Sequence, residues 1–294
     1  MIWRNIKSLL IWFGFLTQKK EEVKIIYVPI VISDEEIGED TEDEKELIEV
    51  LIEETEKEQP KETKEPKIPK NGDVIIWRFG HSLNTSGKET PKQDDGTIIK
   101  EYTLNKQIGT KAIAEGDKLG YESIIANPYD FEDPNEDRAL DIVVGHINRI
   151  NNKALTEKKR VICIDLHCNA HQPNKNKVEF TSASGTVTFY FERRIKNAEG
   201  KELVQYSKKG KQLAISIHEQ MVKRTGLPDR AWSFNRGKAV GANFQALRET
   251  LCVTATVECA FMTNRSDLEY LKSEEGQATI AKAIIKGVDN YFSL

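Results

Sequence analysis

The sequence predicts an α/β fold: a twisted, mostly parallel sheet flanked by helices on both faces and preceded by an N-terminal extension. Two observations support this prediction. From Gly72 onward, short apolar runs alternate with longer segments whose apolar residues recur at helical spacing. From Asp34 to Lys70, the chain is strongly charged and contains several prolines, which is typical of a segment outside a packed core.

The predicted strands and helices alternate along the chain. Apolar runs predict strands at Val74–Phe79, Tyr121–Ala126, Arg160–Leu166, Gly185–Phe191 and Val253–Val257. Apolar residues at i, i+3 and i+4 spacing predict helices at Glu101–Leu119, Glu136–Asn151, Leu203–Lys223 and Ala278–Phe292. Strands separated by helices form βαβ units, so we expect most strands to run parallel.

Residues 1–33 form an apolar N-terminal segment. Its longest apolar run, Leu9–Leu16, has basic residues on both sides and is too short to span a bilayer as an ordinary helix. Three interpretations stay open. The segment is an export or membrane-surface sequence, a helix that docks on a partner, or a start that packs with the apolar run Ile25–Ile32.

Residues 34–70 form an acidic segment followed by a linker. From Asp34 to Pro60 there are 14 acidic residues against two lysines, whereas the whole chain has a net charge of −4. Prolines among lysines and glutamates then indicate a stiff, extended spacer. We therefore place the folded domain at residues 71–294. This domain is almost neutral, and its weak positive balance is compatible with an anionic substrate. The lack of a basic stripe interleaved with aromatic residues argues against nucleic acid.

The four cysteines are Cys163, Cys168, Cys252 and Cys259. No CxxC pair is present, so a zinc–cysteine site is not expected, and we predict buried, reduced side chains. Cys168 and Cys259 each follow a candidate site residue directly. Neighbours on a strand point to opposite faces, so these two side chains should pack behind the site.

Four residues are candidates for a functional site: His81, Glu101, His167 and Glu258. The first, third and fourth each sit just past the C-terminal end of a predicted strand, and Glu101 opens the first predicted helix. Open α/β sheets bind ligands at that edge. Two histidines and a carboxylate can hold a catalytic zinc ion with one position open to water, and a second carboxylate can carry the proton.

The candidates differ in strength when each is taken alone. A loop histidine is usually solvated, and a glutamate near a helix N-terminus is favoured by the helix dipole whatever its role. Glu258 is the sharpest signal, because an acidic residue directly after VTATV is costly to bury without a partner. His171 stands four residues after His167, but the sequence HCNAHQPN breaks a helix, so we treat it as a loop residue.

Taken together, the phrases FGHS, KEYTLN, DLHCNA and VECAFMTN resemble the zinc-dependent N-acetylmuramoyl-L-alanine amidases of the amidase 3 type. NRSDLEYL and AKAIIKGVDNYF look like that family's closing segments, and the resemblance spans residues 73 to 293. Four linked motifs in the family's order are a specific signal.

The resemblance implies a role for each candidate. His81, Glu101 and His167 would bind Zn²⁺, and Glu258 would act as general base and acid. The substrate would be peptidoglycan, cut at the amide between N-acetylmuramic acid and L-alanine. Such an enzyme acts at the cell wall, in the periplasm or outside the cell. It could be a bacterial wall remodeller or a phage endolysin, made in the host cytoplasm or carried by the virion.

The chain departs from the family pattern at two positions. The family usually has Asp-x-Gly-His-Gly, whereas this chain has Arg78-Phe79-Gly80-His81-Ser82. It therefore lacks an acidic residue that could orient a histidine, and a glycine after His81.

Two other readings stay open. One is a zinc peptidase that cuts elsewhere in the stem peptide. The other is a non-catalytic wall-binding or virion structural protein with an amidase fold. The sequence does not indicate an oligomeric state, and residues 1–70 are expected to be a non-catalytic extension.

Overall fold

The computed structural model describes residues 72–126, 140–173, 177–196, 202–235 and 238–294. The chain divides into two units, Met1–Pro66 and Lys67–Leu294, and every described residue belongs to the second. The predictions made for residues 1–70 lie outside the described residues. Within the described ranges, no helix is long and apolar enough to cross a membrane.

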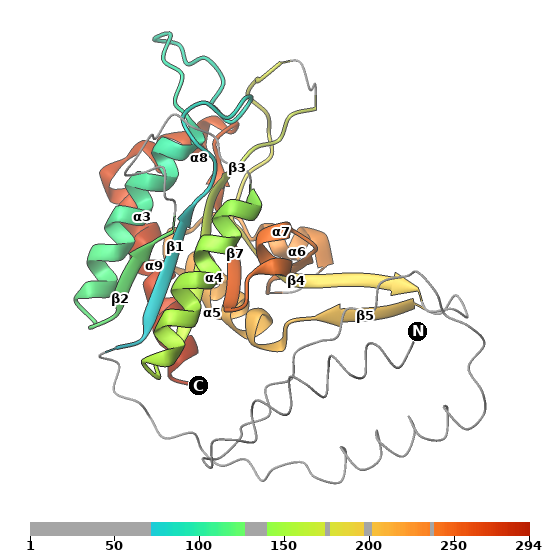
Figure 1. Cartoon of the computed structure of the whole chain (residues 1–294). Coiled ribbons are helices and arrows are strands. Elements are labelled where there is room, and N and C mark those ends of the chain that lie inside the picture. The colour runs from blue at the N-terminus through green and yellow to red at the C-terminus, as the bar shows by residue number, and fades with distance from the viewer. Residues whose placement is uncertain (1–71, 127–139, 174–176, 197–201, 236–237) are drawn as a thin grey trace, which may run out of the picture. The chain divides into compact units, whose positions relative to one another are not determined.

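A seven-stranded sheet forms the centre of the second unit (Figure 1). Its strands are β1 (Val74–Phe79), β2 (Glu122–Ile125), β3 (Val161–Asn169), β4 (Val187–Lys196), β5 (Glu202–Tyr206), β6 (Val240–Ala242) and β7 (Val253–Phe261). They lie in the order β2-β1-β3-β7-β4-β5, with β6 beside β4. β2, β1, β3 and β7 pair in parallel, as does β6 with β4, whereas β4 is antiparallel to β7 and to β5. The sheet is mixed and mostly parallel, as predicted.

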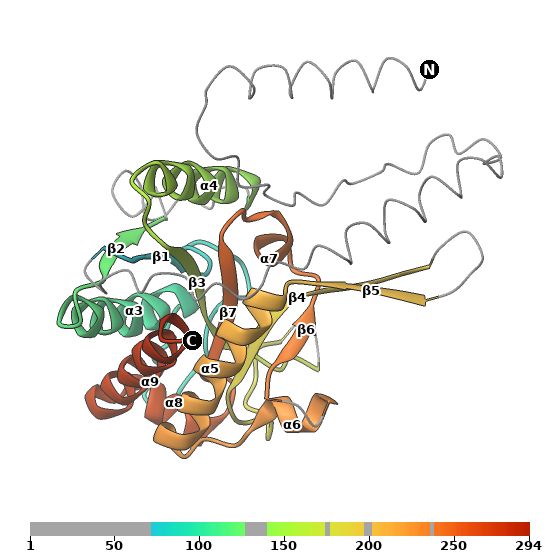
Figure 2. The ribbon, with the colours of Figure 1, turned by 90° about the horizontal axis from the view of Figure 1, so that it is seen from below.

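Helices cover both faces of the sheet (Figure 2). They are α3 (Glu101–Asp117), α4 (Leu140–Thr156), α5 (Lys208–Thr225), α6 (Arg230–Asn235), α7 (Gln245–Glu249), α8 (Arg265–Lys272) and α9 (Glu274–Phe292). The larger core contains Ile75 and Trp77 of β1 with residues of α3, α5 and α9. Val74 and Ile76 point to the other face and pack in a smaller core with α4.

The two central strands are longer than predicted. β3 continues past Leu166 to Asn169, and β7 continues past Val257 to Phe261. The prediction that His167 and Glu258 lie just past strand ends is therefore wrong: the two residues lie inside neighbouring strands and are paired with each other. The backbone N–H and C=O groups of two adjacent strands form hydrogen bonds with each other whatever the side chains are. The pairing of β3 with β7 therefore continues past the apolar residues to the polar ones.

The predicted helix Leu203–Lys223 is wrong at its start. Glu202–Tyr206 form β5, the second strand of a hairpin with β4, and the helix begins only at Lys208. The side chain of Ser207 accepts a hydrogen bond from the backbone N–H of Gly210 and caps α5. The apolar and aromatic residues before this cap are therefore free to pair as a strand.

The remaining differences concern the ends of helices and the short elements β6, α6 and α7, which were not predicted. α4 runs on to Thr156, and the first residues of its predicted range lie outside the described residues. α9 begins at Glu274 rather than Ala278, because Ser273 caps its N-terminus. The four cysteines are free. Cys163, Cys168 and Cys259 are buried, as predicted, whereas the prediction is wrong for Cys252, which is only half-buried.

Candidate metal centre

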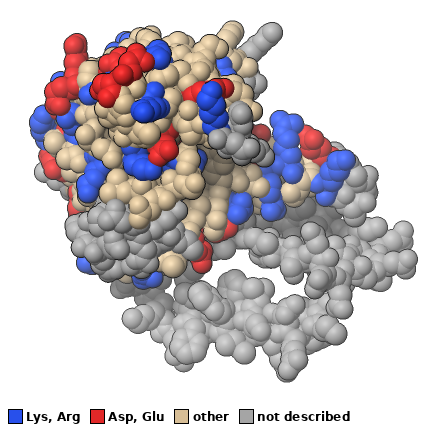
Figure 3. All heavy atoms as spheres, turned by 90° about the horizontal axis from the view of Figure 1, so that it is seen from above, with Lys and Arg blue, Asp and Glu red and all other residues tan. Residues whose placement is uncertain are grey.

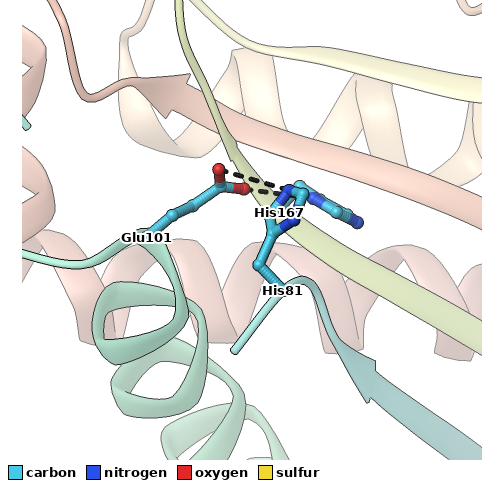
Figure 4. Close-up of side chains that lie close together, drawn as sticks. All are labelled: His81, Glu101 and His167. Atoms are coloured by element: carbon cyan, nitrogen blue, oxygen red, sulfur yellow. Dashed lines mark hydrogen bonds and ion pairs between the residues drawn. The ribbon is translucent and has the colours of Figure 1, made fainter. Parts of the chain in front are cut away.

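Three of the four candidate residues lie close together near the C-terminal ends of β1 and β3. Ligand atoms of His81, Glu101 and His167 all lie within 4.8 Å of one another. Figure 4 shows the Glu101 carboxylate pointing toward both imidazole rings. Its Oε2 lies 3.4 Å from His81 Nε2, and its Oε1 lies 3.1 Å from His167 Nδ1. Two imidazole nitrogens and one carboxylate are the donors found in catalytic zinc sites.

His81 follows β1 and has an uncommon backbone conformation. Its φ of 67° lies in the left-handed region, which a residue with a side chain adopts only when its surroundings hold it there. The next residue, Ser82, is buried, and its backbone N–H donates to Thr85 Oγ1 at 3.0 Å. Ser82 Oγ also accepts from the backbone N–H of Asn84 at 3.3 Å. Ser82 therefore builds the loop that holds His81.

Glu101 opens α3, as predicted, and is buried. Its backbone N–H donates to the carbonyl of Lys88, and its Oε1 accepts from the backbone N–H of Cys168 at 3.2 Å. Burial works to raise the pKa of Glu101, but the hydrogen bond and charge of His167, with a contribution from His81, hold it below its usual range. The carboxylate is therefore fixed and charged, as a metal ligand must be.

His167 lies on β3 directly beside Gly80. A Cβ atom on Gly80 would lie 2.1 Å from Cε1 of the His167 ring, so the ring occupies the space of a side chain at that position. Burial lowers the pKa of His167, but the charge of Asp165 and hydrogen bonds to Asp165 and Glu101 outweigh it and raise the pKa to about 10. Burial instead lowers the pKa of His81 to about 4.

Glu258 lies on β7 opposite His167. Its Oε2 atom is buried and has no hydrogen-bond partner among the described residues. Burial raises the pKa of Glu258 to about 7; the charge of His167 opposes this shift, and the charges of Glu101 and Asp165 reinforce it. A carboxyl group with this pKa can take up and return a proton near neutral pH.

The other histidines have separate partners. His171 is exposed and its backbone N–H donates to Thr263 Oγ1, so it is outside the three-residue cluster, as expected. His146 Nδ1 lies 2.8 Å from the carbonyl of Ala126, and His218 Nε2 lies 2.9 Å from Asp229 Oδ1.

One further residue lies beside this cluster and was not among the predicted candidates. Asp165 lies on β3 two residues before His167, and its Oδ1 is 3.2 Å from His167 Nε2. Its signal was present in the sequence: an acidic residue inside the apolar run VICIDL, by the same reasoning that selected Glu258.

The surface near this edge carries charges of both signs. Figure 3 shows lysine and arginine side chains interspersed with acidic and uncharged ones on the face seen from above. Lys88, in the loop between His81 and Glu101, is close enough for its charge to act on both His81 and Glu258. The face therefore offers local positive charge rather than a continuous basic stripe.

Solved structures of N-acetylmuramoyl-L-alanine amidases share this fold. An N-acetylmuramoyl-L-alanine amidase from Clostridium difficile 630 is 20% identical, with 76% of this chain and 98% of that chain covered and a TM-score of 0.54. The corresponding amidase Ami1 from Mycobacterium smegmatis is 17% identical, with 77% and 99% covered and a TM-score of 0.56. AmiC2 of Nostoc punctiforme is 19% identical, with 76% and 98% covered and a TM-score of 0.54.

One curated relative is similar in sequence. The uncharacterized protein YqiI of Bacillus subtilis is 32% identical over 111 residues, which is 38% of this chain and 45% of that relative. The match thus spans less than half of YqiI.

The family model described as N-acetylmuramoyl-L-alanine amidase matches residues 75–290, which is well over half of the chain and contains all four candidate residues. The phrases around those residues, the mostly parallel sheet and this match agree, and the chain belongs to the N-acetylmuramoyl-L-alanine amidase family.

Proposed function

We propose that residues 71–294 hydrolyse the amide bond between the lactyl group of N-acetylmuramic acid and L-alanine in peptidoglycan. In this proposal His81, Glu101 and His167 hold Zn²⁺, and Glu258 is the general base and acid. The observation that carries it is the meeting of two histidines and a buried carboxylate beside an unpartnered Glu258 oxygen, in a chain of the amidase family.

The donor set fits zinc. Nitrogen and carboxylate ligands suit this ion, and three protein ligands leave a position open for water. Glu101 is kept charged and His81 neutral, so both are in their ligating forms, whereas the proton on His167 must leave when a metal binds. Zinc at this position would polarise the scissile carbonyl and make water more acidic.

Glu258 supplies the proton transfers. Its unpartnered Oε2 accepts the proton of the attacking water, and the protonated carboxyl then delivers it to the departing nitrogen of L-alanine. An amide nitrogen is a poor leaving group, so this delivery matters as much as the attack. A pKa near 7 suits both halves of the task.

Digestion of purified peptidoglycan, with and without a chelator, tests the reaction. We expect new L-alanine amino termini and free lactyl ends by mass spectrometry, and their loss on chelation. New amino termini elsewhere in the stem peptide would instead identify a zinc peptidase. A protein that binds the wall without any turnover would identify the non-catalytic alternative.

Metal content tests the ligand assignment. His167→Ala should lower bound zinc well below one equivalent, because it removes one of three ligands. His171→Ala is the matched control, since this exposed histidine lies four residues further on and outside the cluster. Stoichiometric zinc in the His167→Ala protein would show that His167 is not a ligand.

The proposed reaction also has consequences for where the protein acts and for residues 1–70. Hydrolysis of peptidoglycan takes place at the cell wall, so the domain must reach that compartment. We also propose that residues 1–33 and 34–70 are a non-catalytic extension, the first of which contacts a membrane or a protein.

A further inference from the structure

Beneath the candidate metal centre lies a row of three polar residues on three adjacent strands. Arg78 of β1 is paired in register with Asp165 of β3, and Asp165 is paired with Thr256 of β7. All three are buried. Two residues further along come Gly80, just past the end of β1, His167 on β3 and Glu258 on β7, so the polar row lies directly before the row that contains the site.

Asp165 is the centre of this row. Its Oδ1 accepts a hydrogen bond from Arg78 Nη1, and its Oδ2 accepts one from Thr256 Oγ1 at 3.0 Å. The same Oδ1 lies 3.2 Å from His167 Nε2. A buried carboxylate with three polar partners is held in one orientation and is stable there only while its charge is compensated.

The two ring nitrogens of His167 face different groups. Nδ1 faces Glu101, 3.1 Å away, while Nε2 faces Asp165 and also lies 3.1 Å from Arg78 Nη1. Arg78 Nη1, which can only donate, is within hydrogen-bonding distance of Nε2, so the tautomer of the ring decides between two contacts. With its proton on Nδ1, the ring accepts from Arg78, and that proton blocks the nitrogen that faces Glu101. With its proton on Nε2, the ring donates to Asp165 Oδ1 and leaves Nδ1 free.

We propose that Asp165, held and neutralised by Arg78, is a positioning residue that fixes His167 with its proton on Nε2 and its Nδ1 lone pair toward the metal. This inference rests on the proposed metal centre. It also gives a role to Arg78, which stands where the family usually has an acidic residue. In this chain the acidic residue, Asp165, is on the neighbouring strand, and the positive charge of Arg78 compensates its negative charge. Carboxylates behind ligating histidines raise metal affinity by orienting the ring.

Zinc affinity of the full-length protein, measured by chelator competition without substrate, tests the proposal. Asp165→Asn should raise the zinc Kd about 10- to 100-fold, in the range seen when such partners are removed. Asp73→Asn is the matched control, because Asp73 is a buried carboxylate paired with an arginine, the half-buried Arg160, just before β1 and away from the site. It should leave the zinc Kd unchanged.

The double variant R78M/D165N separates positioning from folding. It removes both buried charges, so it should recover the stability that Asp165→Asn alone loses, while its zinc Kd stays weakened. Recovery of both stability and wild-type zinc Kd would overturn the proposal, as would a wild-type Kd in Asp165→Asn itself.

Long-range ¹H–¹⁵N NMR spectra of the zinc-loaded wild type add a readout that needs no variant. We expect His167 Nδ1 to be metal-bound and Nε2 to carry the proton, and the reverse assignment would overturn the proposal. These results are independent of turnover. An enzyme that binds zinc as expected but leaves peptidoglycan intact refutes only the proposed reaction, whereas a wild type that binds no zinc refutes both.

Discussion

Glu258 and His167 face each other across β7 and β3, and their surroundings move their pKa values in ways that suit different tasks. Burial raises the pKa of Glu258 to about 7, so it exchanges protons near neutral pH. The pKa of His167 is raised because carboxylates face it from both sides and outweigh the effect of burial. A bound cation would replace the proton on Nδ1 of His167, and the proton on Nε2 would stay as the partner of the Asp165 carboxylate.

Glu258→Gln should keep zinc and lose nearly all activity. The amide has almost the same shape but cannot take up a proton, so kcat/KM should fall by roughly 10²- to 10⁴-fold. Metal analysis and peptidoglycan turnover measure the two effects. Glu249→Gln, at the exposed end of α7, is the control. Hydrolysis at the wild-type rate in Glu258→Gln would remove Glu258 from the mechanism.

The pH dependence of kcat/KM should follow Glu258. A general base works only when ionised, so activity is present above its pKa and is lost as the pH falls through it. The pKa of about 7 describes the metal-free protein, and a bound cation would lower it, so the acid limb should lie at or below pH 7. A profile that stays flat from pH 8 to pH 5 would contradict this assignment.

At the scale of elements, two helical glycines have opposite surroundings. Gly287 of α9 lies against the backbone of α5, where a Cβ would be 2.4 Å from the Cα atom of Ile217. Gly145 of α4 has no atom within 4 Å of the place where a Cβ would stand. The first glycine allows two helices to approach closely, whereas the second has no packing role.

Substitution by alanine should therefore change the free energy of unfolding in opposite directions. Gly287→Ala forces α5 and α9 apart and should destabilise the domain by about 1–3 kcal/mol. Gly145→Ala gains helix propensity without a clash and should stabilise it by about 0.5–1 kcal/mol. Urea unfolding followed by circular dichroism measures both. A Gly287→Ala protein as stable as the wild type would mean that the two helices are not so tightly packed.

At the scale of the whole molecule, the described core is built from residues of the second unit. Its two apolar clusters pack on opposite faces of one sheet, and the candidate site stands at the edge of that sheet. Every group that the proposed mechanism uses lies between Gly80 and Glu258. The chain before residue 71 therefore has no part in the chemistry as proposed.

Removal of residues 1–70 should leave zinc content and kcat on soluble peptidoglycan fragments within about twofold of the full chain, since no catalytic group is lost. Turnover of whole sacculi can change, because an extension that contacts a membrane or a protein affects delivery rather than chemistry. The two substrates are assayed side by side with both chain lengths. A truncated protein that folds and binds zinc but fails on soluble fragments would give the extension a catalytic role.

Much of this fold and of its candidate site could be predicted from local sequence. Short apolar runs and helical spacing identify β1, β3, β7, α3 and α9, because periodicity reflects which side chains face the core. His81 follows β1, Glu101 opens α3, and His167 and Glu258 lie near the C-terminal ends of β3 and β7, all in phrases that the amidase family shares. A parallel sheet brings the ends of its strands to one edge, so their proximity follows from the element order.

The register between neighbouring strands follows from the tertiary structure and not from the local sequence. Arg78 and Asp165 are far apart in the chain, and their pairing depends on how β1 and β3 align, which no local pattern specifies. The same is true of Gly80, whose missing side chain makes room for His167, and of β5, where a hairpin with β4 overrides a helical pattern. Local periodicity thus determined most of the longer helices and strands and showed which polar residues lie near the C-terminal ends of the strands. The register between strands decided which carboxylate stands behind which histidine, because hydrogen bonding between strands places distant residues side by side.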